Sequence, residues 1–302
     1  MSDRPSLLPA LTLRQVQYFV ALAHARSFTQ AARSLSLTQP ALTAAIRQIE
    51  YLLGGPLFAR SAHRLTLTAA GASILPLAER LINHARGTFD DMASTFAERY
   101  QTVRIAMIPS IAARLLPVLN TFRDQHPLLR FTLTDLPNSS LIEAVRDGAA
   151  DIGVGVHEPD AVHDRLRFQD VLEDEIVVVA RRDDRLAKRR SVPWSALVDR
   201  DLAVFVRGSV SDSLRRTGGT ENLQLKVTYR MEYTEPLYAL VRNGLAIAVL
   251  PSLYTMHLHD PELLALSLHK PRVTRTIALM SLDGEDRGPH VKACWDHIAA
   301  NL

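Results

Sequence analysis

The sequence has little of what secreted and membrane-spanning proteins contain. It has one cysteine, Cys294, so no disulfide can form within the chain. No apolar run approaches the roughly 20 residues that a helix needs to cross a bilayer. The first ten residues include Asp3 and two prolines but lack the apolar core of a secretory signal. These absences predict a cytoplasmic protein with no membrane partner.

The motifs of common enzyme classes are also missing. The sequence has neither the phosphate-binding GxxxxGK[ST] motif nor the G-x-S-x-G turn of many hydrolases. Gly153 and Gly155 lack the spacing of a dinucleotide fingerprint, and close packing explains them better. His257 and His259 have no third metal ligand at a familiar interval. We therefore predict no catalytic site, no metal and no enzyme activity.

Length and charge indicate two units of different character. The 302 residues exceed the size at which one hydrophobic core is usual, so at least two units are expected. Residues 1–68 contain seven arginines against Asp3 and Glu50, a net charge of +5, which leaves −2 for the rest of the chain. A basic unit joined to a mildly acidic one suggests that the first unit meets a polyanion.

The basic unit is predicted to contain three helices and a short ribbon. Apolar spacing predicts a helix over about 13–25, and Ser27 with Gln30 has the spacing of a capping box for a second. Thr38 can cap a third helix, with Pro40 in its first turn. The pair Gly54-Gly55 ends that helix, and the segment from Leu57 to Leu67 is typical of a two-stranded ribbon.

The exposed face of the third helix suits the reading of DNA bases. At 100° per residue Gln39, Pro40, Thr43, Ala44 and Arg47 share one arc. Glutamine can pair with adenine, and small apolar groups can pack on thymine methyls in the major groove. The ribbon, which carries Arg60, His63 and Arg64, would supply phosphate or minor-groove contacts. The alternative is a generic three-helix bundle whose arginines are merely solvated.

The detailed sequence of this unit resembles the LysR-type transcriptional regulators. The resemblance rests on Ser27-Phe28-Thr29-Gln30-Ala31-Ala32, Thr38-Gln39-Pro40-Ala41-Leu42, Leu57-Phe58-Ala59-Arg60 and Leu65-Thr66-Leu67-Thr68-Ala69-Ala70-Gly71. It implies a winged helix-turn-helix over residues 11–68. This chain has Ala44 where the family commonly has a polar residue or arginine, so the DNA sequence preference is not carried over. The predicted DNA-binding residues are Ser27, Thr29, Gln30, Thr38, Gln39, Pro40, Thr43, Arg47, Arg60 and Arg64.

Residues 69–99 are predicted to form a linker helix that dimerises. The apolar residues Leu75, Ile82, Phe89 and Phe96 recur every seven residues, with Ala78, Ala85 and Met92 between them. This alternation is typical of a coiled-coil seam, so we expect a homo-oligomer, either a dimer or a tetramer built from two dimers. The alternative is a helix that packs on its own domain. Pro76 removes one backbone hydrogen bond, so a local bend is expected.

Residues 100–302 alternate predicted strands and helices, which indicates an α/β fold. The resemblance implies a periplasmic-binding-protein-like effector domain of two subdomains. Subdomain I is expected at about 100–160 and 268–302, and subdomain II at about 161–267. A periplasmic solute-binding protein would share this module, but the basic N-terminal unit and the missing signal sequence argue against that class.

Ligands of parallel sheets bind where strands turn into helices, and several such turns carry hydroxyl groups or glycine. The predicted effector-binding residues are Ser110, Ile111, Asn138, Ser139, Arg207, Gly208, Ser209 and Thr234. Taken singly, each of these turns is better explained as a helix cap than as a ligand contact. Together they favour an anionic group, such as a carboxylate, because helix starts carry unpaired N–H groups. If Glu158 or Glu235 projects into the cleft, a neutral or amine-bearing effector is the alternative.

The sequence therefore predicts a winged helix-turn-helix domain, a linker helix and an α/β effector domain. We expect a LysR-type regulator that binds promoter DNA and responds to a small-molecule co-inducer, without any other cofactor. RNA polymerase is a further expected partner. A small-molecule-binding protein or an enzyme of the α/β class is the alternative.

Overall fold

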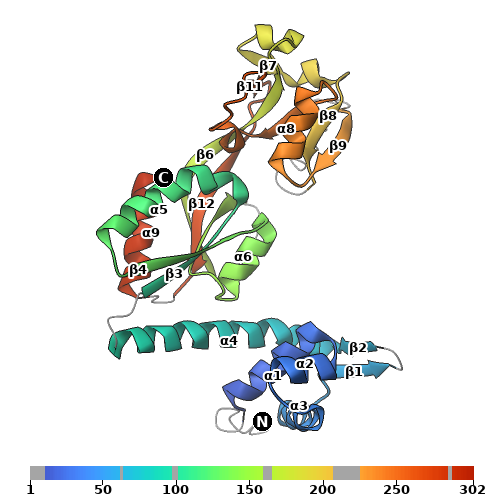
Figure 1. Ribbon diagram of the computed structural model, residues 1–302, viewed down its shortest axis with the longest axis vertical. Helices are drawn as coiled ribbons and strands as arrows, with labels where there is room; N and C mark the ends of the chain where they lie inside the picture. Colours follow the sequence, from blue (N-terminus) through green and yellow to red (C-terminus); the bar gives the residue numbers. More distant parts are fainter. Residues whose placement is uncertain (1–10, 62–63, 97–100, 159–164, 207–224, 285–287) are drawn as a thin grey trace, which may run out of the picture. The chain divides into compact units, whose positions relative to one another are not determined.

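The computed structural model describes residues 11–61, 64–96, 101–158, 165–206, 225–284 and 288–302. The chain divides into an N-terminal unit, which ends at residue 99, and a C-terminal unit, which begins at residue 100. Residues 147–149 are the exception, because they are grouped with the N-terminal unit. Figure 1 shows the secondary structure of both units. Within the described residues, no helix is long and apolar enough to cross a membrane.

Three helices and a ribbon form the N-terminal unit. The helices are α1 (Leu13–Ala25), α2 (Phe28–Ser34) and α3 (Gln39–Leu53), and the ribbon pairs β1 (Phe58–Ser61) with β2 (Arg64–Leu67). Thr12, Ser27 and Thr38 cap the three helices through their hydroxyl oxygens. The reciprocal capping box lies at Thr12 and Gln15, whereas the sequence suggested it at Ser27 and Gln30. Gly54 ends α3 in the left-handed conformation, at φ 82°.

The core of this unit joins the helices to the ribbon. One apolar cluster joins α1, α2 and α3 to the ribbon, because each contributes buried side chains to it, among them Phe19, Leu22, Ala31, Leu42, Ile49, Leu57 and Phe58. The carboxylate of Glu50 on α3 accepts hydrogen bonds from the N–H groups of Leu57 (2.9 Å) and Phe58 (3.3 Å). These bonds fix the position of the ribbon relative to α3.

Helix α4 (Ala69–Phe96) does not expose all the apolar residues that were predicted to form a coiled-coil seam. Ala78 and Ile82 are buried in the core of their own unit, and Leu75 packs against it. This half of the seam therefore follows the alternative prediction, a helix that lies on its own domain. Phe89 and Met92 are 58% and 55% exposed. Together with the exposed Leu77 and Leu81 they form an apolar stripe whose members are four, eight and three residues apart.

Subdomain I of the C-terminal unit is built around a mixed sheet in the order β4-β3-β5-β12. Its strands are β3 (Gln101–Met107), β4 (Leu129–Asp135), β5 (Ile152–His157) and β12 (Thr274–Leu282). Strands β3, β4 and β5 are parallel, and β12 is antiparallel to β5. Helices α5 (Ala112–Gln125) and α9 (Pro289–Asn301) lie together on one face, and α6 (Asn138–Arg146) lies on the other (Figure 1).

Subdomain II has a second sheet and a separate core. It contains β7 (Ser191–Pro193), β8 (Leu202–Phe205), β9 (Val227–Met231), β10 (Ile247–Pro251), β11 (Leu263–His269) and helix α8 (Thr234–Arg242). Trp194 is fully buried, and its indole N–H donates to the carbonyl of Pro271 at 2.9 Å. The sequence did not predict β7 or β11. The helix predicted to begin at Ser209 lies outside the described residues.

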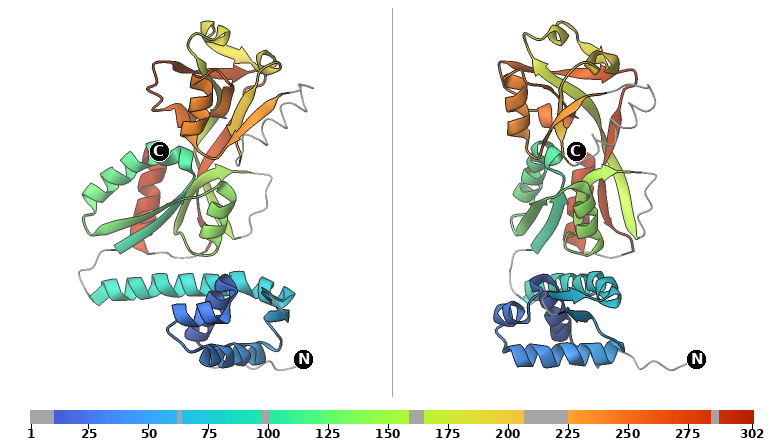
Figure 2. Two further views of the ribbon diagram at one scale, coloured as in Figure 1. Left: turned by 45° about the vertical axis from the view of Figure 1, so that its right-hand side comes forward. Right: turned by 90° about the vertical axis from the view of Figure 1, so that its right-hand side faces the viewer.

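One long strand, β6 (Leu166–Arg181), belongs to both subdomains (Figure 2). Its first half pairs with β12, and its second half pairs with β10 and β11. The sequence predicted only 175–180 of this strand and assigned residues from about 161 to 267 to subdomain II. Side chains of the first half are mostly exposed or half-buried, so that half lacks the apolar run that marks the second. Residues 166–175 thus complete the sheet of subdomain I.

Glycine is required where α4 begins. A Cβ atom at Gly71 would lie 2.1 Å from the carbonyl oxygen of Leu57, a backbone atom that cannot rotate away. Gly71→Ala should therefore force the ribbon and α4 apart and lower the free energy of unfolding by about 1 to 3 kcal/mol. Gly55→Ala is the matched control, because a Cβ there meets nothing within 4 Å. Chemical denaturation followed by circular dichroism would measure both, and equal stability of the two variants would contradict the packing described.

Candidate functional site

The first candidate surface is the exposed face of α3. Gln39, Pro40, Ala44 and Arg47 are exposed on it, and Thr43 is half-buried. The Thr43 hydroxyl donates to the Gln39 carbonyl at 2.9 Å, a bond within the helix. Arg47 has no ion-pair partner among the described residues. This face thus presents a polar amide, small apolar groups and a free positive charge.

A hydrogen bond from α2 positions the side chain of Gln39. The Thr29 hydroxyl at the start of α2 donates to Gln39 Oε1 at 3.2 Å, so the amide at the start of α3 has a fixed oxygen. Gln30 is exposed beside Thr29, whereas Ser27 and Thr38 accept hydrogen bonds from the N–H groups of Gln30 and Ala41 as helix caps. The last two predicted DNA-binding residues, Arg60 and Arg64, lie on β1 and β2, but their side chains are outside the described part of the chain.

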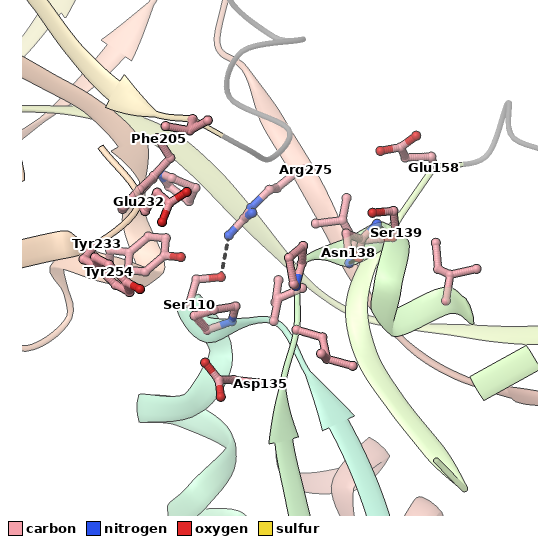
Figure 3. A pocket seen from close by; sticks show the side chains of 18 of the residues that line it. Ser110, Asp135, Asn138, Ser139, Glu158, Phe205, Glu232, Tyr233, Tyr254 and Arg275 are labelled. Carbon is pink, nitrogen blue, oxygen red and sulfur yellow. Dashed lines mark hydrogen bonds between the residues drawn. The ribbon is translucent and has the colours of Figure 1, made fainter. Parts of the chain in front are cut away.

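The second candidate site is a cavity of about 900 Å³ in the C-terminal unit (Figure 3). Subdomain I contributes the turn after β3, the end of β4 and the start of α6. Subdomain II contributes the ends of β8, β9 and β10. The predicted residues Ser110, Asn138 and Ser139 line the cavity, and so does Glu158. A space of this size is typical of small-molecule sites.

Ser110 is the most buried polar group at this cavity. It lies in the short turn η1 (Pro109–Ile111) and is 3% exposed. Its Oγ accepts a hydrogen bond from Nη2 of Arg275 at 2.8 Å. Its own O–H has no acceptor among the described residues. A buried hydroxyl with an unused donor at a cavity wall is suited to bind an acceptor atom of a ligand.

Arg275 is held in turn by a buried carboxylate. Oδ2 of Asp174 accepts from Nε (2.9 Å) and Nη2 (2.7 Å) of Arg275, and the Asp174 side chain is fully buried. Its Oδ1 accepts from the Ser252 hydroxyl at 2.8 Å and from the Leu253 N–H at 3.1 Å. Because Ser252 and Leu253 lie in turn η4 (Ser252–Thr255) of subdomain II, this network joins both subdomains beneath the cavity.

Asn138 has a structural role at the cavity wall. Its amide accepts from the N–H of Val156 at 2.8 Å and donates to the Val156 carbonyl at 3.0 Å, so both ends are engaged. Gly155 makes room for it, since a Cβ there would lie 2.6 Å from Asn138 Oδ1. Close packing therefore explains this glycine, as the sequence suggested. Ser139 is exposed, next to Asn138 at the start of α6.

Two predicted residues do not line the cavity. Ile111, which follows Ser110, is fully buried, and its apolar side chain packs in the core of subdomain I. Thr234 begins α8, and the two residues before it, Glu232 and Tyr233, line the cavity instead. Glu235 also lies outside the lining, 3.5 Å from Arg242. Arg207, Gly208 and Ser209 lie outside the described residues.

Several lining residues had no assignment from sequence. Asp135 ends β4, two residues before a turn that the sequence did single out, so its position offered a signal. Glu232 stands one residue before the predicted Tyr233-Thr234-Glu235 turn. Phe205, Tyr254 and Arg275 carry no local signal, because the chain brings them to the cavity from distant segments.

Tyr254 and its neighbours form an aromatic wall on subdomain II. Its ring packs against Phe205, with centroids 4.7 Å apart, and the Tyr238 hydroxyl donates to its carbonyl at 3.0 Å. Burial raises the pKa of Tyr254; Asp174 and Asp135 add to the rise, and Arg275 opposes it. Burial also raises the pKa of Tyr238 to about 12. Both phenols are therefore neutral near pH 7 and can act as hydrogen-bond donors.

The comparisons with known proteins match both units. The family of bacterial regulatory helix-turn-helix proteins of the LysR type matches residues 13–72, and the LysR substrate binding domain family matches residues 97–302. The Hca operon transcriptional activator HcaR of Escherichia coli is 29% identical over 248 residues, 80% of this chain and 82% of that protein. A probable nitrogen assimilation transcriptional activator of Synechococcus elongatus is 27% identical over 304 residues, 97% of each chain.

Solved structures share the fold of the whole chain. CbnR, a LysR family transcriptional regulator, superposes with a TM-score of 0.72 at 21% identity, over 96% of this chain and 99% of that one. CbnR in complex with its target DNA gives a TM-score of 0.71 over 97% and 100% of the two chains. The chain therefore belongs to the LysR family of transcription regulators, with a helix-turn-helix DNA-binding domain and a C-terminal LysR substrate binding domain.

Proposed function

We propose that this LysR-family regulator reads promoter DNA with the exposed face of α3 and the ribbon. Support comes from the geometry of Gln39, which Thr29 holds at the start of a helix that presents small apolar groups and Arg47 beside it. The hydroxyls of Ser27 and Thr38 and the guanidinium groups of Arg60 and Arg64 would then contact the DNA backbone. Phosphate contacts position the unit, and base contacts select the sequence.

The proposed assembly is a dimer, or a tetramer built from two dimers, formed through α4. Its exposed stripe of Leu77, Leu81, Phe89 and Met92 is an apolar surface that a second copy of the helix would cover. This stripe keeps Phe89 and Met92 of the seam predicted from sequence and adds Leu77 and Leu81. Leu75, Ala78 and Ile82 of that seam pack in their own domain. We further propose RNA polymerase as a partner, a cytoplasmic location and no enzyme activity, in keeping with the family.

The proposed effector site is the cavity of the C-terminal unit. The observation that carries it is the buried Ser110 hydroxyl, whose O–H has no acceptor among the described residues and which lies on the cavity wall. An acidic group of the effector, such as a carboxylate, would accept from Ser110 and from N–H groups at the start of α6. A pure solute-binding protein or an α/β enzyme would leave the N-terminal unit unexplained.

Ligand binding in this cavity would bias the angle between the subdomains. The lining residues come from both of them, so a ligand that contacts both walls stabilises one relative orientation. The long strands β6 and β12 connect the subdomains and would take up the change in angle. A change within one protomer can then alter how an oligomer engages two half-sites of a promoter.

Gln39→Ala should weaken binding to the cognate promoter site by about 1 to 3 kcal/mol and leave binding to random duplexes nearly unchanged, because it removes a base contact. Gln48→Ala, an exposed glutamine of α3 outside the reading face, is the matched control. Fluorescence anisotropy at fixed salt would measure both. Equal loss of specific and random binding would show that Gln39 does not read a base.

Phe89→Asp should dissociate the oligomer without unfolding the N-terminal unit, because it places a charge on the exposed stripe of α4. Sedimentation velocity would show a smaller species with an unchanged circular dichroism spectrum. Thr88→Asp, on the neighbouring half-buried position, serves as the control for added charge. An oligomer that survives Phe89→Asp and Met92→Asp together would exclude the proposed stripe.

Ser110→Ala should weaken effector binding by about 1 to 3 kcal/mol, because the ligand loses a hydrogen-bond donor in a buried position. The effector would first be found by a thermal-shift screen of metabolites, since a ligand of the folded state raises the Tm. Calorimetry on the full chain then compares Ser110→Ala with Ser140→Ala, a serine outside the cavity lining. Unchanged affinity of Ser110→Ala would place the effector elsewhere.

A further inference from the structure

We propose that Thr29 is a positioning residue for base reading: its hydroxyl holds the amide oxygen of Gln39 on the side of α2, so that Gln39 selects adenine over guanine. This inference rests on the proposed function, in which Gln39 reads a base in the major groove. It states how Gln39 discriminates between the two purines, and it assigns Thr29 a role that acts through Gln39.

The first turns of α2 and α3 bring the two side chains together. Thr29 is the second residue of α2, and Gln39 is the first residue of α3. Ser27 caps the first of these helices and Thr38 caps the second, and both helices contribute to one apolar core. The Thr43 hydroxyl also donates to the Gln39 carbonyl at 2.9 Å. The backbones that carry Thr29 and Gln39 are therefore held in place, and only their side chains can adjust.

The hydrogen bond between the two side chains has a defined direction. Oγ1 of Thr29 donates to Oε1 of Gln39 at 3.2 Å, and among the described residues this oxygen is the only acceptor that the Thr29 hydroxyl has. The amide nitrogen of Gln39 has no acceptor in the described part of the chain, and both side chains are exposed. The amide thus directs its oxygen toward α2. It offers a partner two N–H donors and the second lone pair of the oxygen.

A glutamine without such a partner has no fixed order of oxygen and nitrogen. Rotation about its last side-chain bond is broad and roughly two-fold, so the two atoms can exchange places. In this structure the exchange would leave the Thr29 O–H without its acceptor. DNA that covers this surface displaces the water that could replace that acceptor, and an unmade hydrogen bond then costs more than in the free protein. The hydroxyl therefore fixes the order most firmly in the bound state.

The order of these two atoms decides which purine the amide fits. Adenine presents a donor, N6–H, beside an acceptor, N7, on its major-groove edge, and a glutamine amide can bond to both. Guanine presents two acceptors, O6 and N7, at the same two places. An amide oxygen held opposite O6 meets another acceptor and forms no bond, whereas a freely rotating amide could turn its nitrogen toward O6. A fixed Gln39 amide therefore rejects guanine as well as binding adenine.

The test measures base preference as well as affinity. The full chain enriches its site from a pool of random duplexes, and each adenine of a half-site is then replaced by guanine with its complement. Fluorescence anisotropy compares these duplexes for the parent chain, Thr29→Val and Thr29→Ser. We expect Thr29→Val, which keeps the branched shape but lacks the hydroxyl, to reduce the preference for adenine over guanine about fivefold at one position of each half-site. Thr29→Ser keeps the hydroxyl and should retain the preference.

Three further variants show whether Thr29 acts through Gln39. Gln39→Ala should remove the preference at the same position. Adding Thr29→Val to Gln39→Ala should change that preference no further, because the amide is already absent. Ser34→Ala is the matched control, since this exposed hydroxyl of α2 donates within its own helix, to the Ala31 carbonyl at 2.9 Å. It should leave every base preference unchanged.

The possible results separate a failure of this inference from a failure of the proposed function. If Gln39→Ala lowers the preference and Thr29→Val does not, Gln39 reads a base and the inference is wrong. If Gln39→Ala changes no preference, the proposed base reading fails and the inference fails with it. Equal weakening of all duplexes by Thr29→Val would show a contact with the DNA backbone instead. A parent chain that prefers guanine at the Gln39 position would show that the amide is reversed, and either result overturns the inference.

Discussion

The hydrogen bonds of Asp174 connect the segments that form the cavity. Asp174 lies where β6 passes from one subdomain to the other, and its two oxygens bind different partners. Oδ1 holds turn η4 of subdomain II, and Oδ2 holds Arg275 on β12, which in turn reaches Ser110 of subdomain I. Removing one member of a buried ion pair costs about 3 to 5 kcal/mol, because the other charge is left without a partner. The position of both cavity walls therefore depends on this carboxylate.

This arrangement links ligand recognition to the connection between the subdomains. A group that binds the Ser110 hydroxyl acts on an atom that already accepts from Arg275, and Arg275 is bonded to the crossover strand β6. The proposed effector would thus act on the two subdomains through this buried hydrogen-bond network.

The sequence predicted local features well and long-range assembly poorly. The helix caps at Ser27 and Thr38, the end of α3 at Gly54 and the ribbon all carry short-range signals, and the structure contains them. The seam on α4 was wrong for Ala78 and Ile82, because a heptad pattern does not tell whether an apolar face meets a partner or its own domain. The start of β6 was missed because charged side chains on its exposed face hide the strand pattern.

For the residues of the cavity, too, local features were predicted from sequence and long-range contacts were not. The turns after β3 and β4 were predicted from strand ends, and Ser110, Asn138 and Ser139 do line the cavity. Arg275 and Tyr254 reach it only because β12 and η4 return from far along the chain, which no local pattern reveals. The direction of Glu158 was open in the sequence, and the structure places it in the lining while Glu235 lies outside.

The central claim is that Asp174 holds both walls of the cavity, and hydrogen–deuterium exchange of an Asp174→Ala variant of the full chain tests it most directly. The substitution leaves Ser252, Leu253 and Arg275 without their acceptor. The account predicts faster exchange in residues 109–115, 252–256 and 273–276, with no change in residues 13–53 of the N-terminal unit. Exchange in these three segments that is as slow as in the parent chain would contradict it.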